Sequence, residues 1–373
     1  MDSQGVDVTS RKTKCLQSNA SEDAFIIAPD DRILITGATG FIGSRVVESL
    51  LASGFRNLLC FARPSSDPAR TEAIVERQPL GTRVEVFKGN LLSRPDCEAA
   101  CKDAAVIFHL AAGTGEKSFP DAFMNSVVAT RNLLDAAVQS GNVRRLVLIS
   151  SFSVYTNCKK PHGRLLDETC PTEDHGERRG EAYCFAKYQQ EKIVSEYNKK
   201  YGLPYVIVRP GSVYGAGKGG MVGRVGIDSF GVFLHIGGSN KIPFTYVDNC
   251  ADAIVLAGLV KGVDGEIFNV VDDDLPSSRQ FLRAYKKNVK KFRSIYLPHF
   301  VSYALCYMWE RYWHWSEGQL PLAFNRKRWH TYWKKTRYSN QKLKTLLGWN
   351  PKVSTKEAMR RFFESCKQGG SHA

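Results

Sequence analysis

The feature that most constrains the fold is a glycine-rich turn between a short apolar run and a segment with helical spacing. The apolar run ends at Ile35, and glycines follow at positions 37, 40 and 43. Apolar residues then recur with the period of a helix from Ile42 to Leu51. A strand, such a turn and a helix present backbone N–H groups and a helix N-terminus to a pyrophosphate. Three glycines alone are a weak signal, so the alternative is an ordinary strand-to-helix loop.

Each glycine has a separate reason to be there if the turn binds a dinucleotide. Gly37 permits the tight turn, Gly40 lets the backbone approach the phosphates, and Gly43 lets the helix pack close to the strand. We therefore expect the cofactor-binding residues of this turn to be Gly37, Thr39, Gly40, Phe41, Ile42 and Gly43.

Further apolar runs alternate with helical patterns along the next hundred residues. Strands are predicted at 57–63, 84–91, 106–113 and 145–149, and helical spacing runs from Asn125 to Val138. This alternation indicates βαβ units and a parallel sheet with right-handed crossovers. The predicted fold is a doubly wound parallel sheet of the Rossmann type, with a smaller, mainly α-helical C-terminal substrate domain.

The end of the second predicted strand bears on the choice of cofactor. An NAD-binding fold usually carries an acid there, which takes the ribose hydroxyls. Here Phe61 and Ala62 occupy that place and Arg63 follows. Because an arginine can pair with a 2′-phosphate, the sequence favours NADP over NAD. A surface arginine at a strand end is the plainer interpretation.

Several motifs together carry a family resemblance. The turn from Thr36 to Gly43, the strand end from His109 to Ala112, and Asn125 resemble the extended short-chain dehydrogenase/reductase family, which includes epimerases, dehydratases and 3β-hydroxysteroid dehydrogenases. The later stretches that strengthen the resemblance are Ser150–Ser151, Tyr183–Lys187, Arg209–Gly215 and Tyr246–Asn249. The match runs from about residue 31 to 275 and returns at 347–351.

Tyr183 and Lys187 are four residues apart in a segment that is predicted to be helical, so their side chains share one face. A free tyrosine titrates near pH ~10, and a nearby ammonium is expected to lower that pKa. The resemblance implies that Tyr183 moves the proton and that Lys187 tunes the tyrosine and binds the nicotinamide ribose. It also implies that Ser151, four residues before Tyr155, positions the reacting oxygen, while the cofactor carries the hydride.

The resemblance extends to further cofactor contacts. Asn90, followed by Leu91, stands where the family commonly has an aspartate near the adenine. Ala111 and Ala112 would line the dinucleotide path, and Pro210 would face the nicotinamide carboxamide. Tyr246 to Asn249 resembles a motif of the branch that acts on steroids, and we expect it to be architectural.

Residues that some branches of the family carry are absent here, and their absence limits the types of reaction that are expected. Sugar-nucleotide dehydratases usually have an Asp-Glu pair after the serine, where this chain has Phe152, Ser153 and Val154. Together with the missing strand-end acid, this favours reduction of a carbonyl or oxidation of an alcohol. We predict such an oxidoreductase, acting on a sterol- or lipid-like substrate. A nucleotide-sugar epimerase or reductase is the first alternative, and a non-catalytic NAD(P)-binding regulatory protein is the second.

The expected substrate side begins after Pro210. Residues 229–240 carry no charge and include Val232, Phe233, Leu234 and Ile236, which suggests an apolar cover over the substrate. The same residues could be ordinary core, and Lys218 and Arg224 lie nearby.

The C-terminal part is basic and aromatic. The chain has a net charge of +15, and residues 283–344 contain 15 Lys or Arg against two acids. All six tryptophans lie beyond residue 300. Two interpretations stay open: a helical domain with an aromatic core and a solvated basic face, or peripheral membrane contact. The same composition could serve nucleic acid, but no known nucleic-acid module frames the segment.

The expected organisation has five parts. Residues 1–30 form a disordered tail, and 31–210 form the NAD(P)-binding domain, to which 240–275 return. The substrate region comprises 211–239 and 276–365, and 366–373 form a second tail. The polar N-terminal stretch has no signal-peptide core, and no apolar run is long enough to span a membrane.

Ten scattered cysteines without metal-type pairs indicate reduced, mostly buried thiols and no metal site. These features predict a cytoplasmic enzyme with a small apolar substrate and no nucleic-acid partner. They leave membrane association and a homodimer open.

Overall fold

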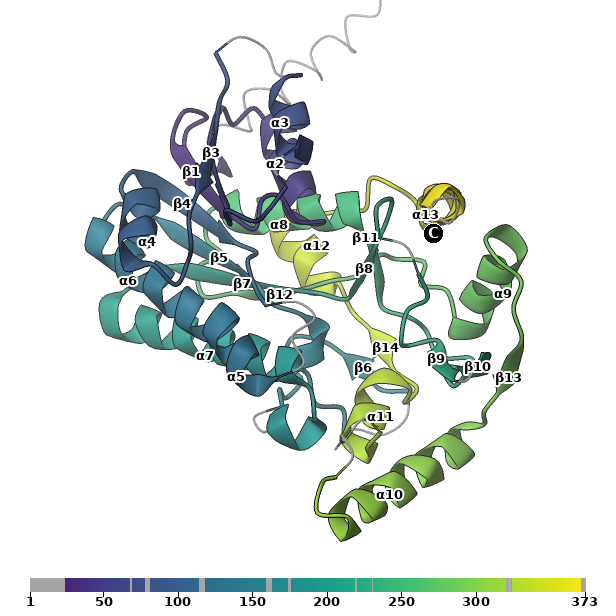
Figure 1. Cartoon of the computed structure of the whole chain (residues 1–373). Helices are drawn as coiled ribbons and strands as arrows, with labels where there is room; N and C mark the ends of the chain where they lie inside the picture. The colour runs from purple at the N-terminus through teal and green to yellow at the C-terminus, as the bar shows by residue number, and fades with distance from the viewer. Residues whose placement is uncertain are drawn as a thin grey trace, which may run out of the picture.

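The centre of the protein, in the part of the chain that the structure describes, is a seven-stranded sheet (Figure 1). The computed structural model describes residues 24–67, 69–77, 81–113, 118–158, 163–173, 176–218, 220–229, 231–319, 322 and 324–369. Every strand pair in the sheet is parallel, in the order β12-β7-β5-β4-β1-β2-β3. The strands are β1 (Arg32–Thr36), β2 (Asn57–Ala62), β3 (Arg83–Lys88), β4 (Ala104–His109), β5 (Arg145–Ile149), β7 (Tyr205–Pro210) and β12 (Ile267–Val270).

Helices cover both faces of this sheet, as the sequence predicted. Successive residues of β1 face opposite layers, so Ile33 and Ile35 belong to one buried cluster and Leu34 to the other. The first layer contains α2 (Gly43–Ala52), α8 (Val247–Leu259) and α12 (Gln341–Leu347). The second contains α4 (Arg94–Cys101), α6 (Ala129–Ser140) and α7 (Ala182–Tyr201). The doubly wound fold is confirmed.

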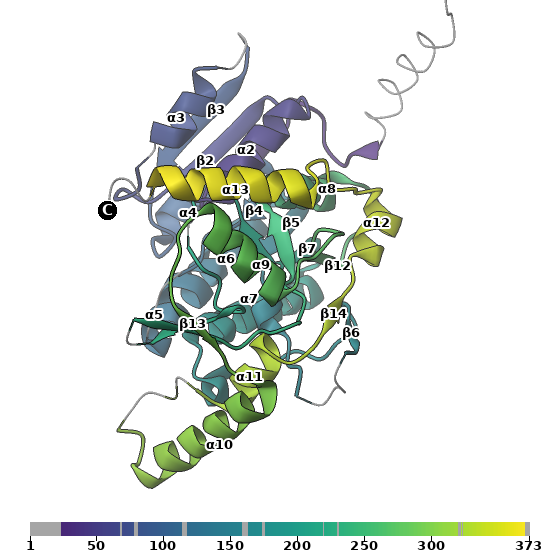
Figure 2. The same ribbon diagram turned by 90° about the vertical axis from the view of Figure 1, so that its right-hand side faces the viewer.

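A second region lies beside the carboxyl ends of the strands. It contains a small sheet, in the order β13-β10-β9, together with several helices (Figures 1 and 2). Its elements are β9 (Gly226–Ser229), β10 (Val232–His235), α9 (Ser278–Asn288), β13 (Ser294–Tyr296), α10 (His299–Trp315), α11 (Arg326–Tyr332) and α13 (Thr355–Gly369). The two-stranded pairs β8 (Ser212–Tyr214) with β11 (Phe244–Tyr246), and β6 (Leu165–Leu166) with β14 (Arg337–Tyr338), join the two regions.

The prediction of a tail over residues 1–30 is wrong for the last residues of that range. Ile27 is only 5% exposed, and the Ile26 N–H donates to the Leu259 carbonyl over 2.9 Å. The apolar residues at 25–27 supply surface that packs against the first layer. The remainder of that tail, residues 1–23, lies outside the described residues.

The expected C-terminal tail, 366–373, is also partly wrong. Helix α13 continues to Gly369, and the half-buried Cys366 packs on the cluster that contains Phe362. Residues 370–373 lie outside the described residues.

The cysteines within the described ranges are all free thiols, and most are buried. Burial raises the pKa of Cys60, Cys101 and Cys184 to about 12, so these thiols are protonated at neutral pH. They behave as small apolar core residues, as expected.

Among the helices of the described ranges, none combines the length and the apolar character that a membrane span requires.

Candidate active site

A cavity of about 870 Å³ opens at the carboxyl edge of the sheet. It lies where the chain, after building β1, β2 and β3 outward, crosses to β4 on the other side of β1. Ligands bind at this kind of switch point in open parallel sheets. Every residue that the sequence proposed for the site lines this one cavity: Gly37, Thr39, Gly40, Phe41, Ile42, Gly43, Arg63, Asn90, Leu91, Ala111, Ala112, Ser151, Tyr183, Lys187 and Pro210.

The three glycine positions of the turn have little or no room for a side chain. Gly37 has a φ of +73°, and a Cβ on Gly43 would stand 2.0 Å from the Gly37 carbonyl oxygen. Helix α2 begins at Gly43, and no side chain of the described residues caps its first turn at Ile42. The N–H groups of an uncapped helix start suit an anionic group. The cradle therefore fits a dinucleotide pyrophosphate.

The far end of the cavity lies at the end of β2. Arg63 and Ser66 line it there, and Phe61 and Ala62 occupy the positions where an acid would stand. Across the described part of the chain, no ion pair involves Arg63. This end of the cavity is therefore bordered by the Ser66 hydroxyl and by the Arg63 guanidinium, which has no carboxylate partner among the described residues.

Asn90 lines the cavity just beyond β3. Its side-chain oxygen accepts a hydrogen bond from the Leu92 backbone N–H over 3.0 Å, and its backbone N–H donates to an Asp96 carboxylate oxygen over 2.7 Å. The asparagine therefore shapes this turn through local hydrogen bonds as well as bordering the cavity.

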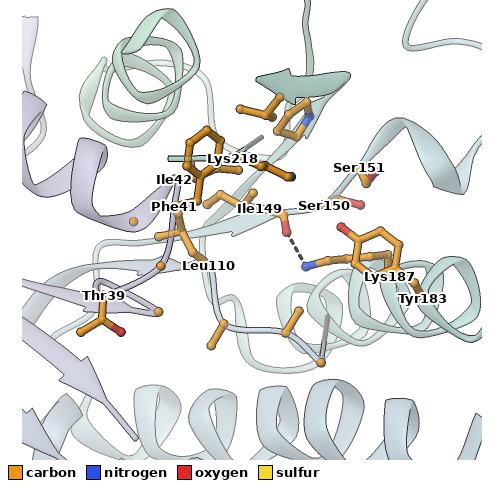
Figure 3. Close-up of a pocket in the computed structure, with 18 of the residues that line it drawn as sticks. Thr39, Phe41, Ile42, Leu110, Ile149, Ser150, Ser151, Tyr183, Lys187 and Lys218 are labelled. Carbon is orange, nitrogen blue, oxygen red and sulfur yellow. Dashed lines mark hydrogen bonds between the residues drawn. The ribbon is translucent and has the colours of Figure 1, made fainter. Parts of the chain in front are cut away.

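Tyr183 and Lys187 extend side by side from α7 toward the end of β5 (Figure 3). The Lys187 ammonium donates to the Ile149 carbonyl over 2.7 Å. Ser151 follows that strand, and its hydroxyl accepts from the Ser153 N–H over 3.1 Å. The Ser151 hydroxyl also lies close enough to the Tyr183 phenol to favour its ionised form. The helix and the strand end thus bring the three predicted catalytic side chains to one wall.

The pKa shifts differ in part from our expectation. Burial lowers the pKa of Lys187 to about 8, against an upward influence of Glu191. Burial also raises the pKa of Tyr183, and the influence of the Ser151 hydroxyl opposes this rise only in part. We expected Lys187 to lower the tyrosine pKa. The expectation is wrong for the net shift, because desolvation of the phenolate outweighs the favourable interactions.

A buried ion pair lies beneath Lys187 and was not predicted. Glu191, one turn further along α7, accepts two hydrogen bonds from Arg209, at 2.9 and 2.6 Å. The Arg209 guanidinium also stacks on the Tyr155 ring, 4.7 Å from its centroid. The only signal in the sequence was the four-residue spacing from Lys187 to Glu191, which does not reveal a partner on β7.

A chain of buried hydrogen bonds fixes α7 against the sheet. His109, at the end of β4, makes 2.8 Å contacts with Thr36 through Nδ1 and with Thr130 through Nε2. Gln190 of α7 donates to the same Thr130 hydroxyl over 2.7 Å. Burial, with a smaller contribution from Lys187, lowers the pKa of His109 to about 3, so its imidazole is neutral. This chain connects β1, β4, α6 and α7.

The motif from Tyr246 to Asn249 joins distant segments. The Asn249 side chain donates to Asp272 over 3.1 Å and to the Val353 carbonyl over 2.8 Å, and it accepts from the Val353 N–H over 2.9 Å. The Trp349 indole donates to the Asn249 carbonyl over 3.2 Å. These contacts connect the start of α8 to the C-terminal segment, which is the architectural role that we expected.

The substrate side of the cavity differs from our prediction. Phe233 and Ile236, from the expected apolar cover at 229–240, are buried in separate core clusters, and no described residue of that segment lines the cavity. The sequence could not separate cover from core because both are apolar. The cavity residues from the C-terminal regions are Gly211, Ser212, Val213, Tyr214, Gly217, Lys218, Gly220, Met221, Val222 and Phe362.

Two cations that the sequence noted nearby have different places. Lys218 lines the cavity, and its ammonium lies 5.4 Å from the centroid of the Phe41 ring. Arg224 instead donates to the Thr331 carbonyl over 2.9 Å and stacks on Tyr332. Of the pair, only Lys218 can contact a ligand in this cavity.

Comparison with curated proteins finds relatives at about 30% identity. Cinnamoyl-CoA reductase 1 of Oryza sativa is 31% identical over 49% of this chain and 53% of the relative. The 3beta-hydroxysteroid-dehydrogenase/decarboxylase isoform 1 of Arabidopsis thaliana is 28% identical over 63% of this chain and 54% of the relative. These alignments span about half the length of the curated relatives.

Comparison with solved structures finds the same fold at lower identity. The UDP-glucose 4-epimerase of Thermus thermophilus, a complex with NAD, matches with a TM-score of 0.65 and 24% identity, over 90% of this chain and 99% of that one. The UDP-glucuronic acid 4-epimerase of Bacillus cereus, also with NAD, gives 0.65 and 22% over the same shares.

A family model decides the assignment. The model described as the NAD dependent epimerase/dehydratase family matches residues 33–270, which include the glycine turn, Ser151, Tyr183, Lys187 and Pro210. The match covers well over half of the chain, and the resemblance to extended short-chain dehydrogenases/reductases is confirmed. The chain therefore belongs to the NAD dependent epimerase/dehydratase family.

Proposed function

We propose that this protein is an NADP-preferring oxidoreductase that interconverts an alcohol and a ketone on a sterol- or lipid-like substrate. The observation that carries the proposal is that Ser151, Tyr183 and Lys187 line the same cavity as the glycine turn. When bound, a nicotinamide cofactor supplies hydride-transfer chemistry. The remaining work falls to side chains of this chain.

The three side chains divide that work. The Ser151 hydroxyl orients the reacting oxygen. In reduction the Tyr183 phenol donates the proton to that oxygen, and in oxidation the Tyr183 phenolate accepts the proton from it. Because burial raises the pKa of Tyr183, the phenol is protonated at neutral pH, which is the state a general acid needs for reducing a ketone. Lys187 supplies hydrogen-bond donors beside the phenol and would hold the nicotinamide ribose.

The end of β2 supports the preference for NADP. Arg63 offers a bidentate donor for a 2′-phosphate, and Ser66 adds a hydroxyl at the same end of the cavity. No acid stands at Phe61 or Ala62 to take the ribose hydroxyls and to repel the phosphate.

The substrate class rests on the other wall. Val213, Met221, Val222 and Phe362 give that wall an apolar surface. Relatives named cinnamoyl-CoA reductase and 3beta-hydroxysteroid-dehydrogenase/decarboxylase match the chain over 185 and 252 residues. An apolar alcohol or ketone fits this surface and the hydroxysteroid in the second of these names.

Lys218 favours a second candidate, a nucleotide-sugar epimerase or reductase. Its ammonium borders the cavity near Phe41, and such a cation would suit a substrate with phosphate groups. A non-catalytic NAD(P)-binding regulatory protein is the third candidate, and the presence of all three catalytic side chains argues against it.

A nicotinamide-absorbance screen of the full chain separates these candidates. NADH and NADPH are each offered with panels of steroids, aldehydes and sugar nucleotides. We expect turnover with NADPH and an apolar ketone. Conversion of UDP-sugars alone, abolished by Lys218→Met, would support the second candidate; a reductase would change the nicotinamide absorbance, whereas an epimerase would change only the sugar configuration, which NMR detects. NADP binding without an absorbance change or a sugar conversion on any panel would support the third candidate and contradict our proposal.

A further inference from the structure

Helix α10 presents an apolar stripe to solvent, which is the reverse of an ordinary surface helix. Phe300 is 77% exposed, Met308 55% and Trp315 80%. At 3.6 residues per turn these positions fall on one side of the helix, and the exposed Leu305 and Tyr312 flank them. We call these five residues the α10 face.

The opposite side of the helix fixes this orientation. Ser302 and Cys306 are buried against α11, and the Trp329 indole donates to the Ser302 hydroxyl over 2.9 Å. The Tyr303 and Trp329 rings meet edge to face, with centroids 5.1 Å apart. Because this packing is specific, the α10 face cannot turn inward without breaking it.

The C-terminal region that carries the α10 face is basic overall, with 15 Lys or Arg against two acids between residues 283 and 344. Arg311 is exposed on the same side of the helix, and the Arg326 guanidinium lies 4.9 Å from the Tyr307 ring centroid. Glu310, the one acid within α10, is paired with Arg326 at 2.7 Å. Glu317 follows just beyond the helix, and the exposed Lys290, Lys291 and Arg293 lie earlier in the chain, before β13.

The position of α10 separates it from the cavity. The helix runs along the edge of the molecule, away from the seven-stranded sheet, in both views (Figures 1 and 2). None of its residues, all of which the structure describes, lines the cavity. An exposed apolar stripe of this kind marks an interaction site and not a part of the catalytic pocket.

We propose that the α10 face docks the protein on an anionic membrane surface, with the helix lying in the plane of the headgroups. Aromatic and long aliphatic side chains beside arginine are the composition that such interfacial helices use. The basic residues near the helix add attraction to anionic lipids. In this arrangement the Phe300, Met308 and Trp315 side chains enter the acyl boundary, and Arg311 contacts phosphate groups.

The observations favour a membrane over a second copy of the chain. A helix of 17 residues is about 25 Å long and about 10 Å wide, so it offers about 250 Å². A stable protein interface needs about 800 Å² on each partner. Two copies meeting here would also bring like charges together, because each carries a basic region around α10.

Co-sedimentation of the full chain with vesicles tests the proposal. Vesicles of phosphatidylcholine with about a third phosphatidylserine are compared with pure phosphatidylcholine, at low and at high salt. We expect binding to the anionic vesicles that weakens at high salt, because screening removes the electrostatic part. The variant Phe300→Glu/Met308→Glu/Trp315→Glu should bind at least tenfold more weakly, and Arg311→Ala about fivefold more weakly.

The matched control is Leu346→Glu, which places one acid at an exposed apolar position on α12, outside the α10 face. This control should bind like the unaltered protein. A second measurement is tryptophan emission, which should shift to the blue on binding because the exposed Trp315 enters an apolar medium. That shift should be lost in Trp315→Phe, a variant that leaves the other five tryptophans in place.

Three outcomes would overturn the proposal. The first is no binding to anionic vesicles at low salt. The second is equal binding by the triple variant, the control and the unaltered protein. The third is a dimer in sedimentation velocity that the triple variant converts to a monomer, which would assign the α10 face to a second copy.

Discussion

The cavity beside the glycine turn and the α10 face are both apolar surfaces bordered by cations, yet they are built in opposite ways. The cavity is concave, and its cations Arg63, Lys187 and Lys218 come from separate segments that the sheet brings together. The α10 face is convex, and one helix supplies all of its large side chains. The first surface can enclose a ligand, whereas the second can only lie against another surface.

The two surfaces should also differ in how strongly substitutions affect the stability of the fold. Beneath the cavity, the buried Glu191–Arg209 ion pair and a chain of hydrogen bonds connect α7 to the sheet, so substitutions there should disturb the whole protein. The α10 face is exposed among the residues that the structure describes, so substitutions there should leave the fold intact. Substitutions on the two surfaces measure this contrast.

Glu191→Gln tests the support beneath the cavity. The substitution leaves the Arg209 charge buried without its carboxylate, and breaking such a pair costs about 3–5 kcal/mol. The matched control is Glu364→Gln, which removes an exposed partner of Arg360 at 2.7 Å and should cost about 0–1 kcal/mol. Urea denaturation measures both free energies of unfolding. Equal losses would mean that the buried pair is not a special support.

Lys187→Met tests the pKa of the buried lysine through the pH dependence of stability. The folded pKa of about 8 lies below the ordinary 10.5, so the stability that the neutral amine contributes is fully present above pH 10.5. It is lost as the pH falls to 8, because the unfolded state then binds the extra proton. As the pH rises from 8 to 10.5, the free energy of unfolding of the unaltered protein should increase relative to that of the variant by an amount on the order of 3 kcal/mol.

Denaturation of the protein and the Lys187→Met variant at a series of pH values measures that difference. Other groups titrate in the same range, but they are common to both proteins and cancel in the comparison. A pH-independent difference would contradict a lowered lysine pKa.

Arg63→Ala tests the NADP end of the cavity. Loss of a charge-assisted hydrogen bond to a 2′-phosphate should weaken NADPH binding by about tenfold or more. NADH binding should stay within about twofold. The control is Arg77→Ala, which removes the same charge from an exposed position that does not line the cavity. Calorimetric titration gives both affinities, and an equal loss for NADH and NADPH would remove the assigned role of Arg63.

Trp315→Ala tests the tolerance of the α10 face. Because this side chain is 80% exposed, we expect a change in unfolding free energy within about 0.5 kcal/mol and no change in NADPH affinity. Urea denaturation and calorimetric titration measure the two quantities. A loss of several kcal/mol would show that the face is covered by this chain in solution and would remove the contrast with the cavity.

The sequence predicted the cavity well because its signals are local. The glycine spacing at 37, 40 and 43 and the Tyr183–Lys187 spacing each lie within a few residues. Parallel strands then bring their carboxyl ends to one edge of the sheet, so residues that follow different strands meet there. The fold follows from the same alternation of strand and helix periods.

The residues that sequence reasoning missed depend on contacts between distant segments. Arg209 follows Glu191 by eighteen residues, and Gln190 meets a threonine sixty residues earlier. Apolar composition at 229–240 could not distinguish a cover over the cavity from core. The aromatic spacing in α10 likewise could not show which side faces solvent, because its packing partner Trp329 lies on another helix.

The most direct test of the central claim is the turnover of Tyr183→Phe with NADPH affinity measured on the same preparation. The substitution removes only the phenolic oxygen that we assign to proton transfer. We expect the NADPH affinity to stay within about threefold while substrate-dependent oxidation of NADPH falls by about 10²–10⁴-fold. Undiminished turnover with intact binding would contradict the assignment of Tyr183 and with it the proposed active site.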